Sequence, residues 1–327
     1  MGTAAWLVEE PGGTFRQIEL ALTALREEHV RIRIAAAGVN PLDTKIRAGK
    51  AAHARQLLPA VLGLDMAGTV EEVGAKVNSF KPGDEVYGMA GGVGGLQGTL
   101  ARVIDVDADL LAHKPRNLSM REAAALPLAV ITSWEALMDQ AKVHEGQSVL
   151  IHAGAGGVGH IAVQIARARG AEVFATVSES KRAIVEGFGA TAIDYRAASV
   201  AEYVEAYTGG KGFDVVFDTV GGATLDDSFI AVKRYTGRVV SALGWGTHSL
   251  APLSFRAATY SGVFTLMPLL TGEGREHQGW ILAQAAAVVE AGKLRPFLSQ
   301  EQFSPANIDE AYARVESGSL GKVVIEM

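Results

Sequence analysis

The chain has 327 residues, enough for two domains that each bury a core, and its 48% hydrophobic and 20% charged composition is typical of a globular protein. A formal net charge of −6 without a basic run argues against nucleic-acid and anionic-membrane partners, because both require a positive surface. There is no cysteine, so disulfides and cysteine-bound zinc are excluded, and with no targeting or membrane-spanning segment recognised we expect a cytoplasmic protein.

The first 120 or so residues lack helical periodicity and are punctuated by turns, which predicts a mostly β domain. Val30, Ile32 and Ile34 alternate with arginines, as in a half-buried strand, and short strands are expected at 68–73 and 84–88.

A helical pattern follows. Ser119 and Glu122 have the spacing of a capping box, Pro127 should break or kink the helix that they start, and a second helical piece is expected at 132–140. The pattern therefore changes from strand to helix shortly before the centre of the chain.

A glycine-rich fingerprint follows a buried strand expected at 148–152, and a helix with apolar residues on one face begins at Val158. A second strand at 171–177 completes the length of a βαβ unit. We interpret Gly154 as the tight-turn residue, Gly156 as the place where the backbone approaches a pyrophosphate, and Gly159 as allowing close packing of helix on strand. The free N–H groups of the helix then face the phosphates, which predicts a dinucleotide site.

Strands and helices continue to alternate after the fingerprint, which predicts a parallel sheet covered by helices on both faces. The expected strands are 191–195, 213–220, 237–243, 260–267 and 322–326, and the expected helices are 181–188, 200–207, 279–291 and 308–315. The last segments are too short for a domain, so we expect them to return to the N-terminal one.

The end of the second strand indicates which dinucleotide binds. An NAD site usually carries an acid there, but this strand ends at Ser178, followed by Lys181 and Arg182. A hydroxyl and cations suit a 2′-phosphate, so NADPH is the expected cofactor. Glu179 lies close enough to weaken this argument, and both basic residues could instead be a solvated helix face.

Five stretches in this order resemble the quinone oxidoreductase (zeta-crystallin-like) family of the zinc-free medium-chain dehydrogenases/reductases. They are residues 38–47, 63–70 and 127–134, the fingerprint, and 218–222. The resemblance implies an α/β fold, with a Rossmann doubly wound parallel sheet and a GroES-like mostly β domain. It places the GroES-like catalytic domain at 1–124, completed by 267–327, and the Rossmann NADP-binding domain at 125–266.

The resemblance also implies the site residues. Near the nicotinamide end it places Asn40, Asp43 and Thr132, and beside the substrate Lys45. The pyrophosphate site is at Gly156, Gly157 and Val158, with Gly154 and Ala155 of the same turn also among the cofactor-binding residues, and the 2′-phosphate site is at Ser178, Lys181 and Tyr195. Val220 and Leu243 would flank the ribose and nicotinamide, and Lys322 is a basic C-terminal position of the cofactor site.

Zinc-dependent relatives hold the catalytic metal through two cysteines and a histidine. This chain has no cysteine and has Leu64 at the family's histidine position, so no metal site is expected. Asp65 replaces a commoner glutamate and is expected to cap a turn beneath the site.

Without a metal the substrate should be activated by conjugation, so we expect an NADPH:quinone oxidoreductase. A hydride would pass to a quinone or other conjugated carbonyl, while Asn40 and Lys45 hold the developing enolate oxygen. Lys45 stands where many quinone oxidoreductases have tyrosine and resembles the residue of alkenal and enone reductases, so Asn40, Asp43 and Lys45 are the catalytic candidates.

Other functions stay open: an enone (C=C) reductase, an enoyl reductase module, or a non-catalytic NADPH-binding redox sensor or crystallin-like protein. The apolar strand expected at 260–267 resembles the edge through which family members pair their sheets, so a homodimer is expected.

Overall fold

The computed structural model describes residues 2–327 and divides into two compact units. Unit 1 is Met1–Leu128, Leu266–Gly292 and Pro296–Met327, and unit 2 is Ala129–Thr265 with Lys293–Arg295. The main division thus falls at Leu128/Ala129 and Thr265/Leu266, whereas the sequence places it at 124/125 and 266/267. The C-terminal segment belongs to the same unit as the N-terminal strands.

Unit 1 is built on antiparallel strands. A three-stranded sheet has the order β2-β1-β4, and a six-stranded sheet has the order β15-β3-β5-β6-β8, with β7 paired to β3. The strands are β1 (Gly2–Val8), β2 (Arg16–Ala21), β3 (His29–Val39), β4 (Ala60–Val61), β5 (Asp65–Val73), β6 (Glu85–Met89), β7 (Val103–Asp107), β8 (Leu111–His113) and β15 (Val323–Glu326).

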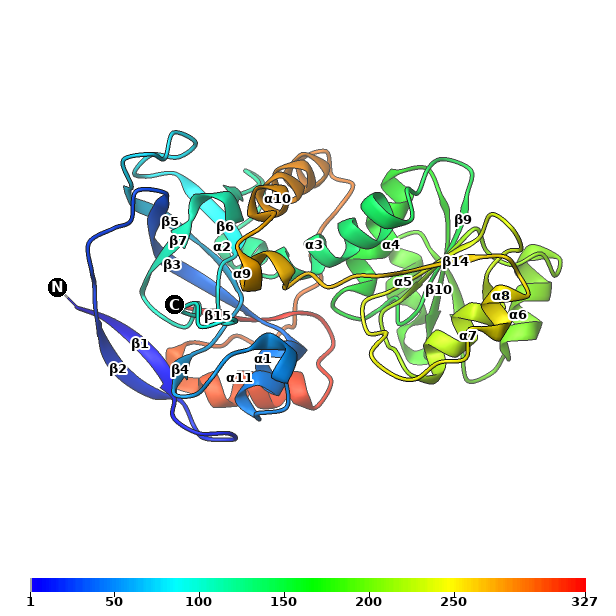
Figure 1. The fold of residues 1–327 in the computed structure, drawn as a ribbon, viewed down its shortest axis with the longest axis horizontal. Coiled ribbons are helices and arrows are strands. Elements are labelled where there is room, and N and C mark those ends of the chain that lie inside the picture. The colour runs from blue at the N-terminus through cyan, green and yellow to red at the C-terminus, as the bar shows by residue number, and fades with distance from the viewer. Residues whose placement is uncertain (1) are drawn as a thin grey trace. The chain divides into compact units, whose positions relative to one another are not determined.

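Helices pack against these sheets: α2 contacts β3 and β5, α10 contacts β8, and α11 contacts β15 (Figure 1). The helices of this unit are α1 (Pro41–Arg47), α2 (Met120–Ala124), α9 (Met267–Thr271), α10 (Arg275–Glu290) and α11 (Ile308–Glu316). The helical turn α1 was not anticipated within a mostly β region. It forms because Asn40 and Asp43 make a capping box around Pro41, whose fixed φ suits the first helical position.

Unit 2 contains one parallel sheet with the order β11-β10-β9-β12-β13-β14. Numbered within the unit this order is 3-2-1-4-5-6, the doubly wound Rossmann arrangement, so the predicted fold class is confirmed. The strands are β9 (Ser148–Ile151), β10 (Glu172–Val177), β11 (Thr191–Asp194), β12 (Val215–Asp218), β13 (Arg238–Ser241) and β14 (Thr259–Gly262).

Helices cover both faces of this sheet, α4 and α5 on one and α6 to α8 on the other (Figure 1). The helices are α4 (Gly159–Ala168), α5 (Arg182–Gly187), α6 (Val200–Thr208), α7 (Ala223–Ala231) and α8 (Ala251–Ser254), and α3 (Pro127–Trp134) begins with the last two residues of the first segment of unit 1 and continues in unit 2. One-turn 3₁₀ segments lie at Ala52–Ala54, Ala108–Leu110, Glu179–Lys181 and Pro305–Asn307, and a π-helical segment at Glu135–Gln140.

Two expectations in this part of the chain need correction. Helix α3 begins at Pro127, so the helical piece starts before the expected residue 132. The strand expected at 260–267 is only β14, because its partner β13 ends at Ser241 and no strand accompanies the chain further. The chain then starts α9, with a proline in its first turn.

None of the helices among residues 2–327 combines the length and apolar character needed to cross a lipid bilayer.

Candidate cofactor site and a buried polar cluster

A cavity of about 580 Å³ lies in unit 2, where the chain leaves the carboxyl ends of β9, β10, β11 and β12. This is the edge of a doubly wound sheet at which ligands bind. Among the predicted cofactor residues, those that line the cavity are Ala155, Gly156, Ser178, Lys181, Tyr195 and Val220. The sequence motifs therefore converge on one space.

The fingerprint turn differs in detail from its prediction. The residue with positive φ is Ala153, at 52°, so Gly154 is not the turn residue. A Cβ on Gly154 would lie 2.5 Å from the Ala175 Cβ, which shows that this glycine is needed for close packing against β10. A Cβ on Gly159 would collide with the Ala153 carbonyl oxygen, so the glycine allows the helix to approach the turn rather than the strand.

Gly156 borders the cavity, and its role at the pyrophosphate stays a prediction. A Cβ there would meet only the Ala153 carbonyl oxygen, at 3.1 Å. Helix α4 starts just beyond it, with Val158 as an N-cap whose side chain makes no capping hydrogen bond. Gly157 and Val158 are not among the residues that line the cavity. Their backbone leads into the start of α4, and the free N–H groups at a helix start stabilise an anion.

His152 directly precedes the fingerprint turn and contacts the same Thr176 hydroxyl as the turn does. Its Nδ1 lies 3.2 Å from the Thr176 Oγ1, which also accepts the Ala153 N–H at 3.1 Å. Burial lowers the pKa of His152 to about 4, so its ring is neutral at pH 7. The Thr219 hydroxyl donates to the His152 carbonyl oxygen at 2.7 Å, which ties the ends of β9 and β12 together.

The 2′-phosphate candidates separate into residues that line the cavity and Arg182, which is held by carboxylates; the Ser178 Oγ also lies 3.2 Å from the Ser180 Oγ. Arg182 binds Glu179 through Nε at 2.9–3.0 Å and also contacts Glu186, and these partners raise the pKa of Arg182 well above its usual range. Glu179 is thereby held by its neighbour instead of facing the cavity. Lys181 and Ser178 line the cavity, together with the half-exposed Tyr195 ring.

Asp218 shapes the turn that carries Val220. Its buried carboxylate accepts the N–H groups of Val220 and Gly221 at 2.9–3.1 Å and the Ser241 hydroxyl at 2.6 Å. Leu243 does not line the cavity, but its N–H donates to the same Ser241 hydroxyl at 3.1 Å. Asp218 therefore fixes the ends of β12 and β13 relative to each other.

A second group of predicted residues forms a buried polar cluster in unit 1. Asn40, Asp43, Asp65 and Lys322 are each at most 5% exposed. The Lys322 Nζ donates to the Asn40 Oδ1, and the Asn40 Nδ2 donates to the Asp65 Oδ2 at 2.9 Å. The Asp43 Oδ2 accepts the Asn40 backbone N–H at 2.7 Å.

Burial is the largest cause of the pKa shifts of Asp43, Asp65 and Lys322 in this buried polar cluster. It raises the pKa of Asp43 to about 8, helped by the neighbouring Asp65 carboxylate and opposed by the Asn40 N–H and Lys322. Burial also raises the pKa of Asp65 to about 6, against the stabilising effect of Lys322, Asn40 and the Leu128 N–H. The pKa of Lys322 is lowered, because desolvation outweighs the two carboxylates.

Two predicted residues lie apart from these groups. Lys45 is exposed on α1 and takes part in none of the hydrogen bonds of the buried polar cluster. Thr132 is buried in α3, and its Oγ1 lies 3.0 Å from the Thr265 Oγ1. Lys45 therefore lies outside the buried polar cluster of unit 1, and Thr132 does not line the cavity of unit 2.

Several residues of these sites escaped the sequence reasoning. In the cavity they are His152, Thr176, Tyr203, Thr224 and Asp227, and in unit 1 Asp65 was expected only to cap a turn. An available signal for Asp65 was its charge within the mostly apolar stretch 60–70, because a buried carboxylate needs partners.

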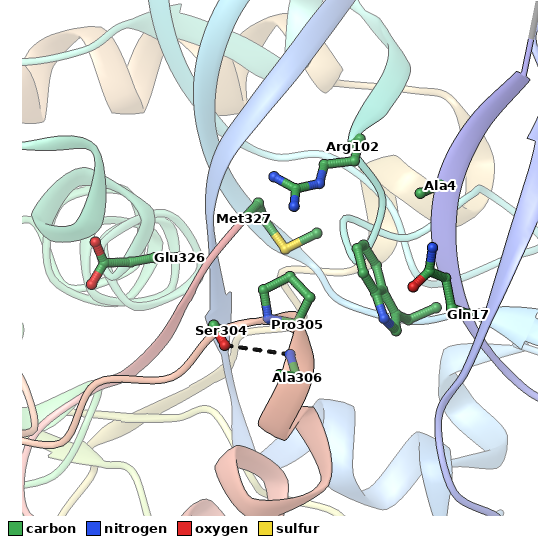
Figure 2. Close-up of a pocket in the computed structure, with 9 residues that line it drawn as sticks. Ala4, Gln17, Arg102, Ser304, Pro305, Ala306, Glu326 and Met327 are labelled. Carbon is green, nitrogen blue, oxygen red and sulfur yellow. Dashed lines mark hydrogen bonds between the residues drawn. The ribbon is translucent and has the colours of Figure 1, made fainter.

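A different hollow in unit 1 has none of the predicted site residues (Figure 2). Arg102, Pro305 and Met327 lie around it, whereas the Glu326 carboxylate is turned away from them (Figure 2). Its polar side chains do not converge on one point, so it lacks the character of a binding site.

The cavity in unit 2 fits a dinucleotide. Gly156 leaves open space at the start of α4, and Lys181, Ser178 and Tyr195 place a cation and two hydroxyls at the border of the cavity. Among residues 2–327, no three His, Asp or Glu side chains are grouped so that they could hold a metal ion.

Comparison with known proteins relates both units to one family. The alcohol dehydrogenase GroES-like domain matches residues 26–116, and the zinc-binding dehydrogenase domain matches residues 157–276. The mostly β unit is therefore GroES-like, as predicted.

Whole-chain relatives agree. The "NADPH-dependent alkenal/one oxidoreductase, chloroplastic" of Arabidopsis thaliana is 33% identical over 98% of this chain and 78% of its own length. An alcohol dehydrogenase superfamily protein from Novosphingobium aromaticivorans is 53% identical, with a TM-score of 0.97 over 99% of both chains. The quinone oxidoreductase of Coxiella burnetii is 27% identical, with a TM-score of 0.83 over 100% of both chains. The chain therefore belongs to the medium-chain dehydrogenase/reductase superfamily, in the family that contains the quinone oxidoreductases.

Proposed function

We propose that this protein is an NADPH-dependent oxidoreductase that reduces quinones or other conjugated carbonyl compounds without zinc. The observation that carries the choice of NADPH is the arrangement beyond β10. Lys181 and Ser178 line the cavity, and the nearby acid, Glu179, is bound by Arg182. The name of the Arabidopsis relative, which specifies NADPH, supports the same choice.

The residues of unit 2 would hold the cofactor along the carboxyl edge of the sheet. The backbone at Gly156, Gly157 and Val158 would bind the pyrophosphate, and Lys181 would pair with the 2′-phosphate. Val220, held by Asp218, would flank the ribose. When bound, NADPH supplies a hydride to an electron-poor carbon.

The absence of cysteine and the presence of Leu64 at the family's histidine position support a reaction without zinc. A substrate that is not polarised by a metal needs another means to stabilise negative charge on its oxygen. Conjugation in a quinone or an enone supplies this, because the charge spreads over the conjugated system. The Coxiella quinone oxidoreductase and the Arabidopsis alkenal/one oxidoreductase carry names of these two substrate types.

The groups of unit 1 would then stabilise the reduced substrate oxygen. The Asn40 Nδ2 group donates to Asp65, which holds the amide in place, and the exposed Lys45 carries an ammonium. Hydrogen bonds from such donors stabilise an enolate, which water or a nearby donor can protonate. Lys45 also favours the enone reductase as the second candidate function.

An acceptor screen that follows NADPH absorbance tests this function. We expect turnover with 1,4-quinones, short enones or both, and a lower kcat for Lys45→Met with enones at nearly unchanged KM for NADPH. Turnover restricted to enones would select the second candidate. NADPH binding without oxidation by any acceptor would contradict both and indicate a redox sensor.

A further inference from the structure

Asp65 has the most constrained carboxylate of the buried polar cluster. It lies on β5 with 0% exposure, and each of its oxygens accepts one hydrogen bond. The Oδ2 accepts from the Asn40 Nδ2 at 2.9 Å, and the Oδ1 accepts from the backbone N–H of Leu128 at 3.0 Å. We propose that Asp65 is a positioning residue that fixes the amide of Asn40, and through it the ammonium of Lys322, for the reduction proposed above.

The hydrogen bonds of Asn40 show how this positioning works. Its amide has a carbonyl oxygen on one side and an NH₂ group on the other. With the NH₂ facing Asp65, the Oδ1 faces the Lys322 Nζ, which donates to it. A rotated amide would place oxygen against the carboxylate and NH₂ against the ammonium, and both contacts would repel. The negative charge of Asp65 therefore selects one orientation of Asn40.

The second oxygen of Asp65 links this chain to helix α3. Leu128 lies in the first turn of α3, where backbone N–H groups have no partner within the helix. Its N–H bonds to Asp65 instead, so one carboxylate joins the helix start to Asn40. An amide at position 65 would present an NH₂ group to one of these two donors, and only a carboxylate accepts from both.

The charged surroundings of Asp65 come from two further elements. Lys322, immediately before β15, favours its ionised form, and Asp43 on α1 carries the other carboxylate of the cluster. Behind Asp43 lie the buried Tyr312 hydroxyl of α11 and Arg47 of α1. The Lys322 ammonium thus faces the ionised Asp65 and the Asp43 carboxyl, which burial keeps protonated near neutral pH, and protonation of Asp65 would weaken it as the acceptor for Asn40.

The test compares Asp65→Asn with a neighbouring variant of equal burial. The Thr99 hydroxyl donates at 3.1 Å to the backbone carbonyl of Asp65 and does not contact its carboxylate, so Thr99→Val removes a buried hydrogen bond beside the same residue. We expect Asp65→Asn to lower kcat at least tenfold with a less than threefold change in KM for NADPH. Thr99→Val should lower Tm with kcat within twofold of the unmodified protein.

A double-mutant cycle separates positioning from a general structural role. In an Asn40→Ala background, Asp65→Asn should cause little further loss of kcat, because the amide that it orients is gone. In that background it should also change Tm little, because the amide oxygen at position 65 can then accept from the Leu128 N–H. Additive losses of kcat, or a kcat of Asp65→Asn equal to that of Thr99→Val, would overturn the proposal.

A further readout needs no variant and uses the unmodified protein labelled with ¹⁵N-asparagine, whose amide signals are observed without turnover. The side-chain amide signals of Asn40 should titrate with a midpoint near pH 6, the pKa of Asp65, and kcat should fall with the same midpoint as the pH is lowered. Signals that do not move between pH 5 and 8 would overturn the positioning role. Absence of turnover with every acceptor would instead contradict the proposed function, and the titration would still decide the role of Asp65.

Discussion

Lys181 and Arg182 are adjacent in the sequence but differ in what surrounds them. Arg182 is occupied by Glu179 and Glu186, whereas Lys181 borders the cavity beside Ser178. A guanidinium that already holds two carboxylates has little left to offer a phosphate. Charge near a binding site is therefore not equivalent to charge available to the ligand, and Lys181 is the residue on which the cofactor preference should depend.

Lys181→Ala should raise KM for NADPH at least tenfold and leave KM for NADH within twofold. A charge-assisted hydrogen bond is worth about 1.5–3 kcal/mol, and about 1.4 kcal/mol corresponds to a factor of ten in affinity. Steady-state kinetics with both cofactors measure this. Lys211→Ala, an exposed lysine of unit 2 away from the cavity, is the control, and a greater loss with NADH would reverse the assignment.

Asp43 provides a second prediction at this scale, through the pH dependence of stability. Burial raises its pKa to about 8 in the folded protein, while the unfolded chain ionises near 3.8. Its contribution to stability is complete below about pH 4 and is lost as the pH rises toward 8, because the folded state keeps a proton that the unfolded state releases. The neighbouring Asp65 acts in the same direction up to about pH 6.

Asp43→Asn should therefore flatten the decrease in unfolding free energy between pH 5 and 8. Each pKa unit corresponds to about 1.4 kcal/mol, so the difference from the unmodified protein should exceed about 2 kcal/mol over this range. Urea unfolding at several pH values measures it. Glu316→Gln, on the exposed side of α11, is the control, and parallel curves for all three proteins would refute the buried, protonated state.

The fingerprint turn shows how a single element combines packing and binding. Gly154 faces β10, with no space for a methyl group against Ala175, whereas Gly156 faces the cavity with only the Ala153 carbonyl nearby. The two glycines are two residues apart, yet one serves the core and the other serves the ligand. The same substitution should therefore affect stability at one position and cofactor binding at the other.

Gly154→Ala should destabilise the protein by about 1–3 kcal/mol, the usual cost of overpacking a rigid core. Gly156→Ala should change Tm little, because its nearest contact would be at 3.1 Å, but it should weaken NADPH binding at least tenfold. Thermal unfolding and calorimetric titration of the two variants provide the comparison. A stable Gly154→Ala protein, or a Gly156→Ala protein with unchanged affinity, would contradict this division.

At the scale of the whole molecule, the edge strand β14 of the unit 2 sheet is where we expect two copies to associate. β14 ends the strand order and has only β13 as a neighbour. The N–H groups of Thr259 and Val263 point to β13, so by strand alternation those of Tyr260 and Gly262 point outward. Such an edge can pair with a second copy, which is the proposed basis of a homodimer.

We expect the protein to elute at twice its chain mass of 34.3 kDa in size-exclusion chromatography with light scattering. Gly262→Pro removes an outward N–H without affecting the pairing to β13 and should shift the protein to monomer. Gly262→Ala retains that N–H and should stay dimeric. A monomeric unmodified protein would rule out pairing through this edge.

The sequence by itself determined the alternation of strands and helices in unit 2. Apolar periods and glycines are local signals, and for a buried parallel sheet they suffice to predict the Rossmann arrangement. The same local signals identified Gly156, Ser178 and Lys181, because each follows directly after a strand of the predicted sheet. They were weaker in unit 1, where α1 depends on a three-residue capping box rather than on a repeated pattern.

Only the tertiary structure decided which of these groups meet. In the structure Arg182 binds Glu179, and the turn residue with positive φ is Ala153 rather than Gly154. Strand β14 ends at Gly262, which pairs with the last residue of β13, Ser241. The tertiary structure also joined Asn40, Asp65 and Lys322, which are separated by up to 282 residues, in one buried hydrogen-bonded chain. The physical reason is that hydrogen bonds and desolvation depend on distance in space, and no local period along the chain encodes contacts between segments so far apart.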